Sequence, residues 1–199
     1  MAEHDRPQLL VLLGNTGSRY ANTRHNIGWM LEDPLLATPG QAGDGWQQKF
    51  KALWTRTTIE GTQVVVLKPQ TMMNLSGEAV QAATRFFKFP AGSVAVAHDD
   101  VELPFGEVGV RFGGGLAGHN GLRSIAHCMA TQDYWRVRVG IGRPVHGELH
   151  GHVLGRFTQD EEAELADILR GTARLVQTGY RDGFSSLPAR TKAASLGQN

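Results

Sequence analysis

A short apolar run, Gln8 to Leu13, lies near the start of the chain and ends at Gly14-Asn15-Thr16-Gly17. An apolar segment of this length, closed by turn residues, is typical of a strand that is buried on both faces. Such strands occur mainly in parallel sheets that helices cover on each side. We therefore predict an α/β fold in which this segment is a central strand.

Further strand patterns follow along the chain. A hairpin is predicted from Ala52 to Thr58 and Thr62 to Leu67, joined across Glu60-Gly61. Two more strands are expected from Ser93 to His98 and from Arg136 to Ile141. The hairpin brings in antiparallel pairing, so the predicted sheet is mixed.

Helix patterns alternate with these strands. Apolar residues recur at helical spacing from Val80 to Phe87 and from Asn120 to Met129. A third helix is predicted to begin at Thr158, whose hydroxyl can cap it while Glu161 reaches back to the same turn. Together these patterns predict a single α/β domain with a twisted mixed β-sheet flanked by helices.

Length and composition are consistent with one domain. A chain of 199 residues with 41% apolar content can bury a single sizeable core. We expect residues 1–199 to form one domain, with flexible N-terminal residues, a loop from Pro39 to Asp44, and a polar tail that frays after Ala189. The early apolar run is too short to span a membrane, so we expect a soluble cytoplasmic protein.

Charge and cysteine content exclude some classes of site. A net charge of +1 gives no general reason to expect a nucleic-acid partner, so any RNA site must be a local patch. Arginines do cluster at Arg136, Arg138 and Arg143. The single cysteine, Cys128, excludes an internal disulfide and a cysteine-rich zinc site.

Polar residues gather just after predicted strands, where open α/β sheets place their functional groups. The clusters are Asn15 with His25, then Asn74, His98-Asp99-Asp100, and Gly113-Gly114-Gly115 leading to His119-Asn120. A histidine beside a carboxylate indicates a general base, and nearby asparagines can position an ester or amide and donate to an oxyanion. No serine or cysteine lies in a Gly-x-Ser-x-Gly setting, so water is the simpler nucleophile.

Each of these patterns also has a structural interpretation. A lone His25 is more often structural than catalytic, and Asn15 and Asn74 could shape turns or cap helices. The glycine triplet could be a plain turn, because it lacks the Lys-Ser or Lys-Thr ending of a phosphate-binding loop. Three later histidines could suggest a metal, but their loop does not have a helical pattern, and solvent-exposed side chains are expected for His146, His150 and His152.

Four segments of the chain carry distinctive motifs: Gly14 to Gly17 with Tyr20 and Thr23-Arg24-His25-Asn26, Lys68 to Gly77, His98 to Pro104, and Gly113 to Leu122. In their order and spacing these segments resemble bacterial peptidyl-tRNA hydrolases. Arg138-Val139-Gly140-Ile141-Gly142 also matches, so the resemblance extends from Leu9 to about Ala189. It implies an esterase that cuts peptidyl-tRNA at the 3′ ribose and recycles tRNA from prematurely released peptides.

The resemblance also assigns residue roles. It implies His25 as the catalytic base and Asp99 as the acid that supports it. It implies substrate or tRNA binding by Asn15, Tyr20, Met72, Asn74, Asn120, Arg111 and Arg138, with the two arginines gripping the tRNA 5′ phosphate and Asn15 helping to separate peptidyl-tRNA from free aminoacyl-tRNA. A cytoplasmic monomer without cofactor or metal is implied as well.

The chain departs from the family pattern at several positions. Thr16 stands where proline is usual, Met72 where an aromatic residue is common, and Leu116-Ala117 where a histidine-glycine pair is common. Gly109 replaces a basic residue found in some relatives. None of these changes removes a group with an implied catalytic role.

Two other functions stay open at this point. One is an RNA-binding module without activity, since a plant organelle splicing factor with this fold also resembles the family. The other is a metal-dependent amidohydrolase that uses His98, Asp99 and the later histidines. Turnover of peptidyl-tRNA distinguishes the first, and sensitivity to a chelator distinguishes the second.

Overall fold

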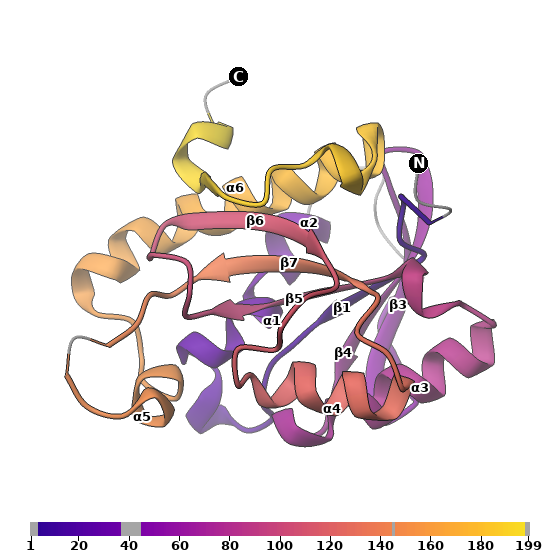
Figure 1. The fold of residues 1–199 in the computed structure, drawn as a ribbon, viewed down its shortest axis with the longest axis horizontal. Helices are drawn as coiled ribbons and strands as arrows, with labels where there is room; N and C mark the ends of the chain where they lie inside the picture. Colours follow the sequence, from indigo (N-terminus) through magenta and orange to yellow (C-terminus); the bar gives the residue numbers. More distant parts are fainter. Residues whose placement is uncertain (1–3, 37–44, 145, 198–199) are drawn as a thin grey trace.

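A computed structural model describes residues 4–36, 45–144 and 146–197 (Figure 1). Its eight strands form one sheet in the order β2-β3-β4-β1-β5-β7-β6-β8. The predicted loop from Pro39 to Asp44 lies outside the described residues.

The middle of the sheet is parallel and its edges are antiparallel. The parallel strands are β4 (Thr62–Pro69), β1 (Leu9–Leu12), β5 (Val94–Asp100) and β7 (Trp135–Gly140). Antiparallel pairs add β2 (Gln47–Lys49) and β3 (Ala52–Ile59) on one side, and β6 (Glu107–Phe112) and β8 (Thr191–Lys192) on the other. The predicted mixed sheet and the central place of the first strand are both confirmed.

Helices cover both faces of the sheet. Leu10 and Leu12 of β1 pack in one core with α1 (Ile27–Met30), α2 (Glu32–Leu36) and α6 (Gln159–Asp182). Alternate residues of the same strand, Leu9 and Val11, face a second core against α3 (Ser76–Phe87) and α4 (Asn120–Met129). Figure 1 shows α6 above the sheet and α3 with α4 below it. The continuous apolar run of β1 is therefore required because both of its faces are buried.

The predicted start of the long C-terminal helix is confirmed. Thr158 Oγ1 accepts a hydrogen bond from the Glu161 backbone N–H at 3.3 Å, and the Glu161 carboxylate accepts one from the Thr158 N–H at 2.7 Å. These two bonds form the expected capping box. Among the described residues, α6 and the other helices are all too short or too polar to cross a membrane.

The C-terminal segment differs from the prediction that it frays after Ala189. Thr191 and Lys192 form β8 against β6, and the following 3-10 helix, Ala193–Gly197, packs on α6. Ala193 is fully buried. A Cβ atom at Gly171 of α6 would lie 2.3 Å from the Ala193 carbonyl oxygen, so a glycine on the helix allows the close approach that holds this polar segment.

Helix α4 ends at a residue with unfavourable backbone geometry. Ala130 is exposed and has φ 54°, the left-handed conformation in which glycine is favoured. Ala130→Gly is therefore expected to raise the free energy of unfolding by about 0.5–1 kcal/mol. Urea denaturation measures this change, and Ala130→Val, which adds a β-branch at the same φ, is expected to lower it. A destabilised glycine variant would contradict the assignment.

Candidate active site

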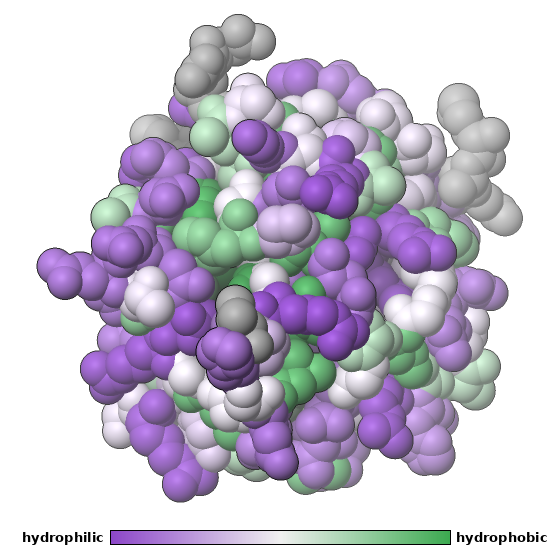
Figure 2. All heavy atoms as spheres, turned by 60° about the vertical axis from the view of Figure 1, so that its left-hand side comes forward, coloured by the Kyte–Doolittle hydropathy of each residue, from purple (hydrophilic) through white to green (hydrophobic). Residues whose placement is uncertain are grey.

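A pocket of about 830 Å³ lies at the carboxyl ends of the parallel strands, between the α4 N-terminus and the short helix α5 (Leu149–Val153). Figure 2 shows a hollow with hydrophobic residues inside and hydrophilic residues around it. All nine residues that the resemblance singled out line this pocket: Asn15, Tyr20, His25, Met72, Asn74, Asp99, Arg111, Asn120 and Arg138. The sheet thus brings together side chains from six separate segments.

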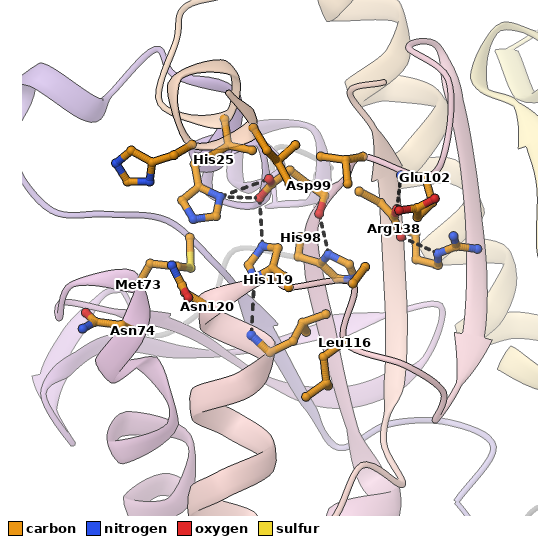
Figure 3. A pocket seen from close by; sticks show the side chains of 18 of the residues that line it. His25, Met73, Asn74, His98, Asp99, Glu102, Leu116, His119, Asn120 and Arg138 are labelled. Atoms are coloured by element: carbon orange, nitrogen blue, oxygen red, sulfur yellow. Dashed lines mark hydrogen bonds and ion pairs between the residues drawn. The ribbon is translucent and has the colours of Figure 1, made fainter. Parts of the chain in front are cut away.

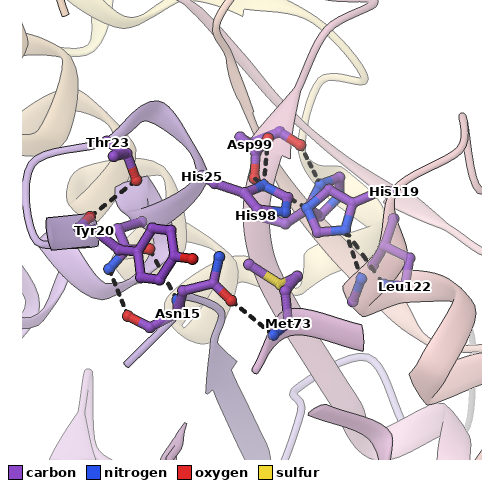
Figure 4. Close-up of polar contacts among 11 residues, drawn as sticks. Asn15, Tyr20, Thr23, His25, Met73, His98, Asp99, His119 and Leu122 are labelled. Carbon is purple, nitrogen blue, oxygen red and sulfur yellow. Dashed lines mark hydrogen bonds and ion pairs between the residues drawn. The ribbon is translucent and has the colours of Figure 1, made fainter. Parts of the chain in front are cut away.

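Asp99, near the end of β5, lies at the centre of the polar network (Figures 3 and 4). His25 Nδ1 lies 2.9 Å from Asp99 Oδ1 and 3.0 Å from Oδ2. His119 Nε2 lies 2.9 Å from the same Oδ1. The strand continues to Asp100, beyond its predicted end at His98, so the backbone of Asp99 is fixed by sheet pairing.

The contacts of His119 determine which of its ring nitrogens carries the proton. The backbone N–H groups of Gly121 and Leu122 point at His119 Nδ1, at 3.1 and 3.3 Å. Because these are donors, Nδ1 is an acceptor and the proton of the neutral ring is on Nε2, which donates to Asp99. His25 donates to the same carboxylate through Nδ1, which leaves its Nε2 as an acceptor.

Burial and charge act in opposite directions on Asp99. Burial of this carboxyl group, which is 2% exposed, favours the neutral acid. The neighbouring His119 and His25, through charge and hydrogen bonding, outweigh burial and hold the pKa of Asp99 well below its usual value. Asp99 is therefore a carboxylate that accepts bonds from two histidines.

His98 contacts the same network from the side. Its Nδ1 donates to the Asp99 carbonyl oxygen at 2.7 Å, and its ring meets that of His119 edge-on at 5.1 Å between centroids. Burial, followed by the charge of His119, lowers the pKa of His98 to about 4. His98 is thus a neutral ring beside Asp99 and His119 and adds no positive charge near neutral pH.

Asn15 is buried directly after β1 and is held on two sides. Its Oδ1 accepts a hydrogen bond from the Met73 backbone N–H at 2.7 Å. Its own backbone exchanges two bonds with the Asn26 side chain, at 2.8 and 3.0 Å. Since Oδ1 is occupied, the amide N–H groups of Asn15 are the part that can donate to a ligand (Figure 4).

The other predicted binding residues lie around this network and are more exposed than Asn15. Asn74 lies in the 3-10 turn Met73–Leu75, and Asn120 is the first residue of α4; both are exposed. Met72 is 40% exposed and Tyr20 is half-buried on the pocket wall. These side chains are free to meet a bound ligand from several directions.

Three arginines line the pocket and differ in their contacts. Arg138 Nε donates to Asp100 Oδ2 at 2.7 Å, so part of its charge is already paired. Arg111 is exposed. Arg136, to which the sequence assigned no contact, is buried and donates to the carbonyl oxygens of Gly114 and Gly115. Arg136 therefore orders the glycine run that forms one wall.

Gly109 lies opposite Arg138 in the antiparallel β6–β7 pair. A Cβ atom at this position would lie 2.1 Å from the backbone oxygen of Ala189. In this chain the segment around Ala189 leaves no room for a side chain at position 109, so glycine fits the packing there.

A metal site built from the later histidines is not supported. His146 and His150 are exposed as predicted, but His152 is half-buried, and its Nε2 lies 3.2 and 3.0 Å from the carbonyl oxygens of Ile141 and Gly142. The loop also contains the short helix α5, which the sequence did not indicate. Within the described ranges, the group with metal-ligand geometry is instead His25, Asp99 and His119, whose donor atoms lie within 4.8 Å of one another.

His119 is the residue of the network to which the sequence assigned no role. It lies within the Gly118-His119-Asn120-Gly121 motif, but only the neighbouring asparagine was given a function. The signal that could have identified it is its place one residue before a helix, where a side chain reaches both the helix N–H groups and the strand ends.

Comparison with known protein families shows to which family the chain belongs. A family model described as peptidyl-tRNA hydrolase matches residues 9–198. The chain belongs to the peptidyl-tRNA hydrolase family. Its relatives include peptidyl-tRNA hydrolases of Geotalea daltonii, 44% identical over 89% of this chain and 92% of the relative, and of Acidiphilium cryptum, 47% identical over 89% and 93%.

Solved structures of the peptidyl-tRNA hydrolase family agree with this fold. A crystal structure of peptidyl-tRNA hydrolase from Acinetobacter baumannii aligns with a TM-score of 0.81 at 32% identity and covers 91% of both chains. The family resemblance given by the sequence motifs is therefore confirmed, as is the α/β fold with a mixed sheet.

Proposed function

We propose that this chain hydrolyses the ester that joins a peptide, or an N-blocked amino acid, to the 3′ ribose of tRNA. Family membership supports the substrate class. The observation that carries the chemistry is the Asp99 carboxylate, which accepts from His25 Nδ1 and leaves His25 Nε2 available as a base in the pocket. The biological role we propose is the recycling of tRNA from prematurely released peptidyl-tRNA.

In the proposed mechanism, His25 Nε2 takes a proton from water as the water oxygen attacks the ester carbonyl carbon. The Asp99 carboxylate stabilises the imidazolium that forms. The tetrahedral intermediate then collapses, the bond to the ribose oxygen breaks, and His25 returns its proton to that oxygen. The products are a peptide with a free carboxylate and tRNA with a free ribose hydroxyl.

Amide side chains supply the binding contacts in this proposal. The Asn15 amide N–H groups, fixed by the bond from Met73, can donate to the peptide part of the substrate or to the developing oxyanion. Asn74 and Asn120 hold the peptide and the attacking water, with Tyr20 and Met72 along the groove wall. Arg111 and Arg138 bind tRNA phosphate, and Arg111 is the less encumbered of the two because Asp100 pairs with Arg138.

We further propose that the protein acts as a monomer, in the cytoplasm, and without a metal. The His25, Asp99 and His119 group has donor atoms close enough for an ion, but its ring nitrogens are better assigned as N–H donors to one carboxylate. Activity is therefore expected to be unchanged after dialysis against a chelator, measured as the initial rate of peptide release. A loss restored by zinc or another divalent ion would contradict a metal-free mechanism.

The direct test of the function is release of N-acetyl amino acid from N-acetyl-aminoacyl-tRNA, with free aminoacyl-tRNA as the comparison substrate. We expect turnover of the blocked substrate and at least about tenfold slower turnover of the free one, because a charged α-amino group cannot serve the amide contacts. Binding of tRNA without release would instead favour the RNA-binding module.

A further inference from the structure

Arg24, which directly precedes His25, is a buried arginine outside the pocket lining. Its side chain is only 8% exposed, and its guanidinium group lies 5.3 Å above the ring of Phe157. Nη2 donates to Glu161 Oε2 at 2.5 Å, and Nη1 donates to the Arg156 carbonyl oxygen at 2.5 Å. A buried charge is retained only where it is paired, so these contacts fix the position of the side chain.

The partners of Arg24 belong to α5 and to the segment that follows it, since Nη1 also lies 3.5 Å from the His152 carbonyl oxygen. The Arg24 backbone N–H donates to the Gly155 carbonyl oxygen at 3.0 Å, and Thr23 forms an isolated antiparallel bridge with Arg156. Immediately before this segment, four residues from α5 and its C-terminal end line the pocket: Leu149, His150, Val153 and Leu154. Figure 1 shows α5 standing apart from the sheet. The contacts of Thr23 and Arg24 therefore join this wall to the turn that carries His25, and the His152 ring joins it separately to the backbone after β7.

Glu161 connects the same point to the longest helix. Its Oε2 atom accepts both the Arg24 guanidinium and the Thr158 backbone N–H that begins α6. One carboxylate thus joins the start of α6 to the His25 turn. The planar guanidinium suits this junction because it donates in several directions at once, which a lysine ammonium on a flexible stem does less well.

We propose that Arg24 is a positioning residue that holds the α5 wall of the pocket in register with His25. This inference rests on the proposed role of His25 as the base. In this proposal Arg24 does not contact substrate. It acts through the backbone of the adjacent His25 and through the α5 wall. If the connection is lost, the wall shifts relative to the base, and the ester is held less well at the distance that attack requires.

Arg24→Met removes the donors while keeping a long apolar side chain over Phe157. We expect KM for N-acetyl-aminoacyl-tRNA to rise about tenfold, the effect of losing a hydrogen bond to a charged group. Glu161→Gln is the milder second variant, because glutamine keeps an oxygen for the helix cap but loses the ion pair. We expect the double variant to be no worse than Arg24→Met alone, since both changes remove one connection. Arg170→Met, at an exposed pair with Asp167 on α6, is the matched control and should behave as the intact protein.

Hydrogen exchange of the amides from Leu149 to Gly155 gives a second readout that does not depend on activity. We expect Arg24→Met to accelerate exchange in this segment while the strands of the sheet stay protected. KM within twofold of the intact protein, together with unchanged α5 exchange, would overturn the proposal, even if kcat fell through partial unfolding. If the intact protein released no peptide, the proposed function would fail, while the exchange rates would still decide the role of Arg24.

Discussion

His25→Ala is expected to lower kcat/KM for N-acetyl-aminoacyl-tRNA by about 10⁴-fold, the upper range for removal of a general base. The reason is that His25 Nε2 is the acceptor left available in the pocket once Nδ1 donates to Asp99. Because the printed contacts of the His25 ring are with Asp99 and His119 in the pocket, the fold should persist, and Kd for tRNA should change little. Single-turnover release of N-acetyl amino acid measures the effect.

His127→Ala is the matched control for this experiment. His127 is an exposed histidine on α4, outside the pocket lining. We expect it to keep full activity. Full activity of His25→Ala would require the site assignment to be abandoned.

Asp99→Asn is expected to lower kcat/KM by about 10⁴-fold, the loss when the acid of a hydrolytic triad becomes an amide. An asparagine oxygen can accept one histidine, but its amide nitrogen must donate to the other. That reversal favours a proton on His25 Nε2 and removes the base from the ring atom that faces substrate. The rate of N-acetyl amino acid release at neutral pH checks this, and a variant within tenfold of the intact protein would contradict it.

The same substitution has a pH signature in stability. His119 and His25 outweigh burial and depress the pKa of Asp99 below its unfolded value, so the carboxylate stabilises the fold above the unfolded pKa. This contribution is lost as the pH falls through the acidic range toward the folded pKa. The free energy of unfolding of Asp99→Asn should therefore fall less between pH 6 and pH 3 than that of the intact protein. Asp167→Asn, at an exposed position on α6, should follow the intact protein.

Local sequence signals predicted the fold where the stabilising contacts are themselves local. The capping box from Thr158 to Glu161 spans only four residues of chain, and the continuous apolar residues of β1 by themselves predict that both faces of the strand are buried. The C-terminal segment does not follow this rule. Polar residues from Thr191 onward are ordered by pairing with β6 and by the close approach that Gly171 allows, and neither partner is near in sequence.

The residues of the candidate site also divide into those that local motifs predicted and those whose roles depend on partners distant in sequence. Motifs indicated His25, Asp99 and the asparagines, and the sheet brings them to one pocket. His119 was missed because its role depends on a carboxylate twenty residues earlier in the chain. Arg24 was missed because its partner Glu161 is 137 positions away and the contact exists only in three dimensions.

The proposed mechanism requires a particular tautomer of His25 and of His119, and ¹⁵N nuclear magnetic resonance of the two imidazole rings measures both tautomers directly. The contacts to Asp99, Gly121 and Leu122 predict that, in the neutral rings, His25 carries its proton on Nδ1 and His119 on Nε2. Asp99→Asn should disturb both signals. A proton on His25 Nε2 in the intact protein, with Nδ1 bare, would contradict the account, because the atom assigned as the base would then be a donor.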